Sequence, residues 1–241
     1  RHLIAPKLSP ERKDSMWTIE GKYLPEDKVT SLKRWLVNFS NEMDINDKAH
    51  LSAQYYRVSD PEYFKEIDRT NTNVKTLKSF LKLTYEDEEN SLSAGVLTED
   101  EQVVNAGTPG YTRALEGSVS KTLNADTKMP ISLSLVSTKF SHATPTKDSG
   151  LRTHGNLGVS RQLNIEYPKI TPRASVAITN YSLKNSPNIN RTVFGSGLDI
   201  DLTINNPSSI FGYKANHRIS PLISYNYRAK KVQGNIPIFD T

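Results

Sequence analysis

Hydrophobic and polar residues alternate along most of this chain, which is the period of a β-strand with one apolar and one polar face. The segment Leu198–Ile204 is the clearest case, because every even-numbered position in it is Leu or Ile and the intervening positions are Asp199, Asp201 and Thr203. The same alternation marks Trp17–Tyr23, Trp35–Ser40, Leu51–Tyr56 and Leu77–Tyr85, and less clearly Ser91–Leu97, Thr112–Lys121, Ile131–Ser141, Leu151–Leu163, Ala174–Ser182 and Leu222–Arg228.

We therefore predict an all-β fold, with about 11 strands in an antiparallel up-and-down sheet that forms part of a large transmembrane β-barrel. Residues typical of turns separate the strands. They occur at Asp87–Asn90, Ala143–Gly150, Leu183–Asn190 and Asn205–Ala215, and in the longest connector, Asp60–Lys75, where Pro61–Ile67 is predicted to form a short helix.

Two features favour a membrane barrel over a soluble β-sandwich or a β-solenoid. The strands are long, whereas those of soluble sheets are usually about 5–6 residues, and the polar sides of several strands carry full charges in their centres. Trp17 and Trp35 suit either the aromatic girdles of a barrel or the core of a sandwich. The candidate charges facing a barrel lumen are Lys22, Lys78, Lys82, Asp199 and Asp201.

The composition narrows the function further. Only 36% of the residues are hydrophobic and no long apolar run occurs, so a membrane-spanning helix is excluded. The chain has no cysteine, and its net charge of +5 comes from basic residues spread along the sequence, which is not the pattern of a nucleic-acid surface.

No catalytic or cofactor motif stands out. The histidines show no metal-binding spacing. His154 and Ser160 suggest an outer-membrane lipase pair only remotely, since an ordinary strand histidine explains His154 better. Asp199 and Asp201 share one face of their strand and are more simply solvated carboxylates than a catalytic pair. We expect no enzyme activity, no cofactor and no metal.

Three ordered motifs point to a family. They are Tyr23-Leu24-Pro25-Glu26-Asp27 followed by Arg34-Trp35; Tyr55-Tyr56-Arg57-Val58-Ser59-Asp60-Pro61-Glu62-Tyr63-Phe64; and a final group with Pro221, then Gln233-Gly234-Asn235-Ile236-Pro237-Ile238-Phe239-Asp240-Thr241. Their content and order resemble the barrel of the lipopolysaccharide-assembly family LptD. The chain departs from that family's pattern at Tyr56, Ile219 and Ser220, where Asn, Leu and Glu are usual. Between Ile67 and His217 it matches in strand pattern alone.

The resemblance implies a non-enzymatic translocon component that inserts lipopolysaccharide into the outer leaflet of a Gram-negative outer membrane. It implies that the partners are lipopolysaccharide itself, an LptE-type plug lipoprotein and the periplasmic Lpt bridge proteins. The predicted barrel also contacts outer-membrane lipid. It also implies that residues 1–241 are an internal barrel segment, without the periplasmic domain, the closing strands or the lateral gate. Lys22, Lys78 and Lys82 could attract phosphates, although pairing with nearby acids is the simpler expectation. We expect Pro25, Asp60, Tyr63, Pro237 and Asp240 to hold turns and strand ends.

Another outer-membrane barrel, such as a porin or an adhesin, and a soluble sandwich that binds a ligand remain the alternatives. Both account for the alternation of apolar and polar residues. Neither accounts for the three motifs in this order.

Overall fold

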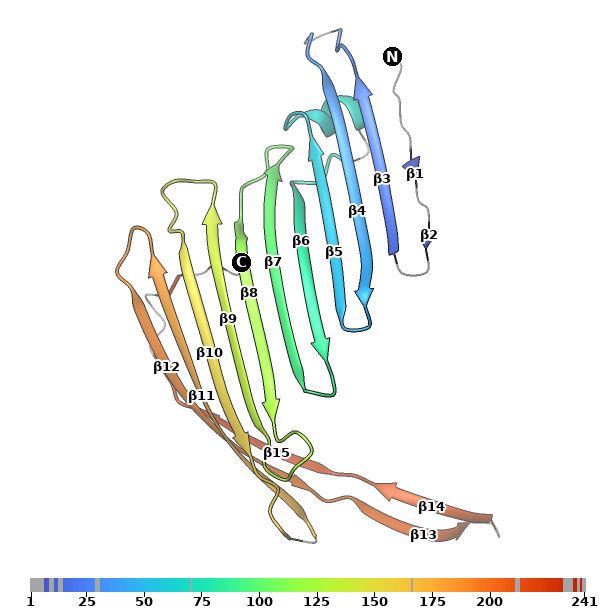
Figure 1. Ribbon diagram of the computed structural model, residues 1–241, viewed down its shortest axis with the longest axis vertical. Coiled ribbons are helices and arrows are strands. Elements are labelled where there is room, and N and C mark those ends of the chain that lie inside the picture. The colour runs from blue at the N-terminus through green and yellow to red at the C-terminus, as the bar shows by residue number, and fades with distance from the viewer. Residues whose placement is uncertain are drawn as a thin grey trace.

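The protein is a single antiparallel sheet in which each long strand pairs with the next along the chain (Figure 1). This computed structural model describes residues 7–8, 11–12, 15–28, 31–69, 71–165, 167–210, 213–231, 236–237 and 239. The long strands are β3 (Ser15–Leu24), β4 (Arg34–Asn46), β5 (Ala49–Val58), β6 (Thr76–Asp87), β7 (Leu92–Val103), β8 (Tyr111–Leu123), β9 (Ile131–His142), β10 (Gly150–Ser160), β11 (Lys169–Leu183), β12 (Ile189–Asp201) and β15 (Leu222–Arg228).

Short elements complete the architecture. Strands β1 (Lys7–Leu8) and β2 (Glu11–Arg12) pair with β3 at one edge of the 13-stranded sheet, and a π-helix, η1 (Phe64–Asp68), lies between β5 and β6. Strands β13 (Ile204–Ile210) and β14 (Tyr213–Ile219) form a separate hairpin that projects from one end of β12 and β15 (Figure 1). No helix among the residues described is long and apolar enough to cross a membrane.

The predicted all-β, up-and-down sheet is confirmed, and the predicted helix in the β5–β6 connector is present as η1. One prediction is wrong: residues Asn205–Ala215 belong mostly to the β13–β14 hairpin, not to a turn-rich loop. Their Asn, Pro and Ser content is typical of turns, but the pairing of Ile204 with Ile219 and of Ile210 with Tyr213 closes a backbone ladder that overrides this weak local preference.

The alternation in sequence becomes two chemically different faces of the sheet. Register places Phe39 opposite Tyr55, Leu83 opposite Val96 and Val119 opposite Leu135, so side chains of one kind align across strands. We call the side that carries Phe39, Leu83, Val119, Leu135, Ile178 and Phe194 the apolar face. The side that carries their neighbours Ser40, Lys82, Ser118, Ser134, Thr179 and Gly195 is the polar face.

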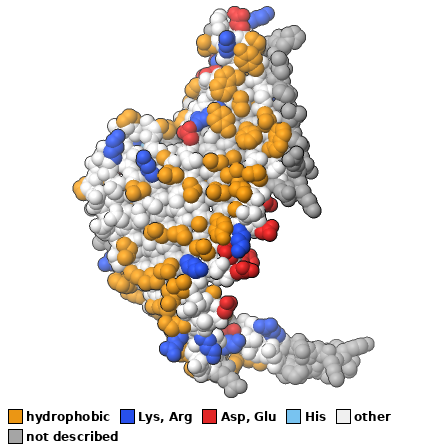
Figure 2. All heavy atoms as spheres, in the orientation of Figure 1, with side chains coloured by type: hydrophobic (Ala, Val, Ile, Leu, Met, Phe, Trp, Pro, Cys, Tyr) orange, Lys and Arg blue, Asp and Glu red, His pale blue; other side chains and the backbone are white. Residues whose placement is uncertain are grey.

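Hydrophobic side chains of the apolar face are exposed at many positions across the sheet (Figure 2). Phe194 is 61% exposed, Ile178 55% and Val96 51%, although each lies in the middle third of a well-paired strand. A β-sandwich would bury these side chains against a second sheet, so the sandwich alternative does not fit. A continuous exposed apolar area of this kind marks a surface that meets lipid or another protein.

Aromatic residues lie near both ends of the apolar face. Tyr23 pairs with Trp35 where β3 and β4 meet the loop that joins them, and Trp17 and Tyr85 lie toward the opposite strand ends. A belt of amphipathic rings at each boundary of an apolar band is typical of barrel walls in membranes. The placement favours the girdle interpretation of the two tryptophans over the sandwich core.

The strands are displaced progressively along their own direction from β3 to β12, and the sheet curves strongly toward β15 (Figure 1). Such stagger and coiling are required before a sheet can close into a barrel. The two clusters of buried hydrophobic side chains both include residues of the polar face, so the limited core of the fold lies on this side of the sheet.

Candidate functional site

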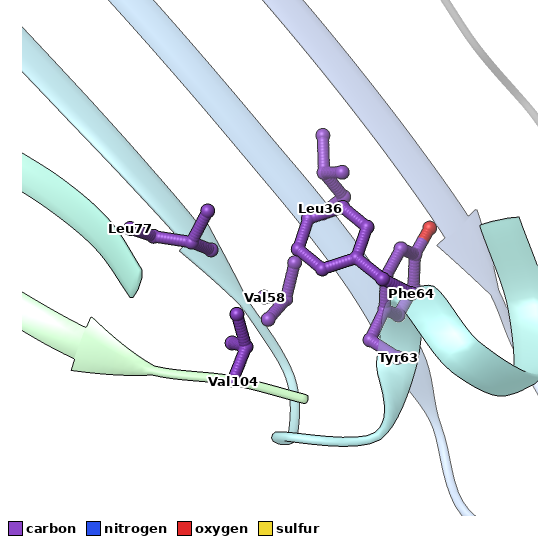
Figure 3. Packing of buried hydrophobic residues seen from close by; sticks show 6 residues of the cluster. All are labelled: Leu36, Val58, Tyr63, Phe64, Leu77 and Val104. Atoms are coloured by element: carbon purple, nitrogen blue, oxygen red, sulfur yellow. The ribbon is translucent and has the colours of Figure 1, made fainter. Parts of the chain in front are cut away.

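The polar face concentrates the chemistry of the chain, and its best-ordered part lies under the β5–β6 connector. Here η1 and the residues before it fold onto the ends of β4, β5 and β6 (Figure 3). Tyr63 and Phe64 are almost fully buried against Leu36 and Val58, and their rings pack edge to face, with centroids 5.6 Å apart. Burial raises the pKa of the Tyr63 phenol.

Ion pairs of Arg34, in β4, hold the β5–β6 connector against the sheet. The guanidinium of Arg34, whose side chain is 5% exposed, lies 2.5 Å from Glu66 Oε2, 3.2 Å from Asp60 Oδ1 and 3.5 Å from Asp27 Oδ2. One cation therefore joins the β3–β4 loop, the turn after β5 and η1. Such a planar group can engage several carboxylates at once, which a lysine ammonium does less well.

A second ion pair and an asparagine add to the same structure. Lys22 lies 3.2 Å from Asp68 Oδ2 and 3.4 Å from Glu20 Oε1, so this predicted lumen lysine is paired with acids. Asn105, with a φ of 49°, donates its side-chain amide to the carbonyl oxygens of Asn71 and Val74. The sequence motifs contain Arg34 and Asp60 but gave no sign of Asn105, Glu66 or Asp68, because loop residues carry no periodic signal.

Strands β5 and β6 separate next to this cluster. Their ladder runs from Ala49–Tyr85 to Gln54–Phe80 and stops there, although β5 continues to Val58. Two side chains replace the missing backbone partners. Gln102 accepts a hydrogen bond from Val58 N at 2.9 Å and donates one to Val58 O at 2.8 Å, and Ser79 Oγ accepts from Tyr56 N at 3.1 Å. The sheet thus keeps hydrogen bonds to the end of β5 where β5 and β6 diverge.

Two described residues of the final motif, Ile236 and Phe239, lie in an unexpected place. Phe239 stacks on Phe140 of β9 with ring centroids 4.5 Å apart, and it also contacts Tyr111 of β8 and Tyr181 of β11. Ile236 packs against the same cluster. Although β15 pairs with β12, Ile236 and Phe239 thus lie against strands that come earlier in the sheet. Pro237 lies outside the described strands, since β15 ends at Arg228, and its role at a turn or strand end stays a prediction.

The remaining predicted residues are spread over both faces. Leu24 and Pro25 end β3, Tyr55 lies on the apolar face, and Ser59 donates to Asp60 Oδ2 at 2.7 Å. Pro221 immediately precedes β15. Gln233, Asp240 and Thr241 lie outside the described residues.

The other predicted lumen charges are not gathered into one site. Lys78 and Lys82 lie on the polar face of β6, and among the described residues neither is an ion-pair partner of the carboxylates that surround Arg34. Asp199 accepts a hydrogen bond from Arg173 at 2.8 Å, whereas Asp201 accepts from Thr203 at the end of β12. The carboxylates of Asp199 and Asp201 thus accept hydrogen bonds from different residues and do not act as a pair.

The structure offers no support for the lipase pair. His154 Nδ1 lies 2.8 Å from Thr179 Oγ1, while Ser160 is six positions along the same strand, or roughly 20 Å away. Within the described ranges, no group of three or more His, Asp or Glu side chains is placed to hold a metal ion.

Turns at the strand ends carry exposed charges. Lys48, in the turn between β4 and β5, lies 2.9 Å from Asp87 Oδ2 at the end of β6. The hydrogen bond that the Lys48 ammonium donates to the Asp87 carboxylate raises the pKa of this ammonium. This pair fastens neighbouring hairpins at the end of the sheet opposite the Arg34 cluster.

Comparison with known proteins places these features in a family. The family model "LptD: LPS transport system D" matches residues 33–241. Similar curated proteins named "LPS-assembly protein LptD" come from Hahella chejuensis, with 25% identity over 92% of this chain, and from Thiobacillus denitrificans, with 25% identity over 90%. A third, from Neisseria gonorrhoeae, is 25% identical over 91% of the chain.

The chain spans about 30% of the length of these relatives: 30%, 30% and 29%, respectively. The family match covers β4 to β15 and includes the three sequence motifs except for the residues before position 33. The chain belongs to the LptD family of lipopolysaccharide transport proteins.

Proposed function

We propose that this chain forms part of the wall of an outer-membrane barrel that delivers lipopolysaccharide to the membrane. The location is the outer membrane of a Gram-negative bacterium, as the sequence predicts. The observation that carries the proposal is a single-layer sheet with one bare apolar face and one charged, hydroxyl-rich face. In a barrel the apolar face meets lipid, and the polar face lines an aqueous lumen.

Residues 1–241 act in this proposal as a segment of the barrel domain. The chain's relatives are named for lipopolysaccharide assembly, and they are about three times its length. The segment's own contribution is structural: its long strands pair most of their backbone groups with neighbouring strands, which an irregular backbone exposed to lipid cannot do. The β5–β6 connector, held inward by Arg34, narrows one end of the lumen.

The partners we propose are lipopolysaccharide, an LptE-type plug lipoprotein and the periplasmic Lpt bridge proteins. A polar barrel interior suits both a hydrated saccharide and a plug protein. Transport in this scheme requires no bond to be made or broken, so the segment acts as a conduit and not as an enzyme.

A crosslinking experiment tests the proposal. A photoreactive amino acid is placed at Ser118 on the polar face or at Val119 on the apolar face, in the full-length protein in cells. We expect Ser118 to crosslink to lipopolysaccharide only while cells synthesise it, and Val119 to crosslink to membrane lipid in all conditions. If the Ser118 position captures no lipopolysaccharide, the conduit proposal is wrong.

A further inference from the structure

A large hollow lies on the polar face, over β9 to β12. Its volume is about 1040 Å³, and it is bounded by the sheet on one side and by residues 228–231, at and after the end of β15, on another. A second hollow of about 410 Å³ shares Asn156, Ser175, Gly195 and Arg228 with it. Together we call them the basic cavity. Binding pockets for small molecules are typically about 300–1,000 Å³, so the basic cavity has room for a ligand of several rings.

The strands under the basic cavity, which form its floor, carry small side chains, and these leave the space above the sheet open. A Cβ on Gly195 would lie 2.6 Å from Ser175 Oγ, and one on Gly158 would lie 2.6 Å from Ser132 Oγ. Glycine thus faces serine across neighbouring strands, and neither member of a pair fills the space above. The floor also offers the Asn156 amide and several hydroxyl groups as hydrogen-bonding partners.

The rim carries an excess of positive charge. Arg191, Arg228, Lys230 and Lys231 line the larger hollow, and no Asp or Glu is found among the described residues that line either one. None of the four forms an ion pair within the part of the chain that the structure describes. Arg173, in the smaller hollow, is by contrast already paired with Asp199. Four unneutralised cations around a concave site raise the local concentration of anions.

The chemistry favours an acidic saccharide over an acidic protein. A protein partner would need a well-packed apolar or aromatic centre. Among the described residues that line the larger hollow, the apolar side chains are only Ala177, Val193 and Ala229. Hydroxyl and amide groups on the floor suit sugar hydroxyls, and arginine binds phosphate with two parallel hydrogen bonds. We propose that the basic cavity binds the phosphorylated saccharide of lipopolysaccharide. This proposal rests on the function proposed above.

The test is a binding measurement on the full-length protein in detergent. The probe is the phosphorylated oligosaccharide of deacylated lipopolysaccharide, titrated by calorimetry into the wild type and into Arg191→Gln/Arg228→Gln. Lys121→Gln/Lys139→Gln, which removes the same charge from the apolar side of the sheet, is the matched control. We expect the cavity variant to bind at least tenfold more weakly and the control to match the wild type. Arg191→Lys/Arg228→Lys replaces the Gln variant if the latter does not fold, and we expect it to bind with intermediate affinity.

Two further probes identify the source of the anion. The same oligosaccharide without its phosphates should bind at least tenfold more weakly, and inorganic phosphate alone should bind more weakly than the intact probe. Equal affinity of wild type and cavity variant overturns the proposal, as does equal binding of the dephosphorylated probe or of inorganic phosphate. Loss of a copurifying lipoprotein from the cavity variant, with saccharide binding unchanged, also overturns it and assigns the surface to a protein.

The two proposals fail in different ways. If Ser118 still crosslinks to lipopolysaccharide while the cavity variant binds the oligosaccharide normally, the conduit stands and the cavity assignment falls. If neither crosslinking nor oligosaccharide binding is seen, both are wrong.

Discussion

Replacing Arg34 with Met should release the β5–β6 connector from the wall. The side chains have similar length, but Met leaves three carboxylates without their common cation. Asp27 is 8% exposed and would remain largely buried, whereas Glu66 at 47% and Asp60 at 24% can be partly hydrated. Breaking a buried ion pair costs about 3–5 kcal/mol of folding free energy. Because Glu66 and Asp60 are partly exposed, we expect Arg34→Met to cost about 3 kcal/mol, the lower end of this range.

Limited trypsin digestion measures this loss. Lys65 and Arg69 are exposed cleavage sites in the connector, and cleavage follows the opening equilibrium when opening is fast. A loss of about 3 kcal/mol corresponds to roughly 150-fold faster cleavage. The experiment uses the folded full-length protein in detergent. Cleavage after Lys128, in the turn between β8 and β9, reports whether the rest of the sheet is intact.

Arg57→Met is the matched control for Arg34→Met. Among the described residues Arg57 pairs with Asp100, which is 73% exposed, so the loss should be at most about 1 kcal/mol, or about fivefold in rate. If connector cleavage in Arg34→Met rises no more than in Arg57→Met, the carboxylates do not depend on Arg34 for burial and the reasoning is wrong.

Three further substitutions test other contacts. Gly107→Ala should destabilise the protein by about 1–3 kcal/mol, because the new Cβ would lie 2.4 Å from the backbone oxygen of Lys75. Gly117→Ala is the control and should not destabilise it, because nothing lies within 4 Å of the new Cβ. The midpoints of urea unfolding in lipid vesicles compare the two variants. Gln102→Ala should leave Val58 N and O without the hydrogen bonds that Gln102 makes to them, at a cost of about 1–3 kcal/mol. The loss should appear as faster amide exchange at Val58, and unchanged exchange would show that Gln102 does not replace the missing backbone partners. Phe239→Ala should weaken docking of the last described residues by about 3–5 kcal/mol, measured by hydrogen exchange around position 236, and Phe239→Leu should retain most of the protection.

Sequence reasoning recovered the features that depend on local periodicity. The alternation around Leu83 and Leu198 predicted both the strands and the face that each residue occupies, because a pleated strand allows only two directions for its side chains. The β13–β14 hairpin was missed because its residues are individually poor strand formers and pair only with each other.

Contacts between distant segments could not be predicted in this way. Asn105 holds a connector that precedes it by more than thirty positions, and nothing in its neighbourhood distinguishes it from any other turn asparagine. The basic cavity escaped for the same reason: Arg191 and Arg228 lie in different motif-free segments, and only the β12–β15 pairing brings their strands together. Even charge distribution along a sequence does not imply even distribution in space.

The return of the chain to Phe140 has a consequence for the order of assembly. Phe239 and Tyr111 are separated by about half of the chain, so their contact closes a very long loop and is favourable only after the strands between them have paired. The aromatic cluster needs β8, β9 and β11 in register at once, since each contributes one ring. Docking of Phe239 is therefore a late event that reports a completed wall: a mispaired strand anywhere between Tyr111 and Tyr181 would leave this residue without a place to bind.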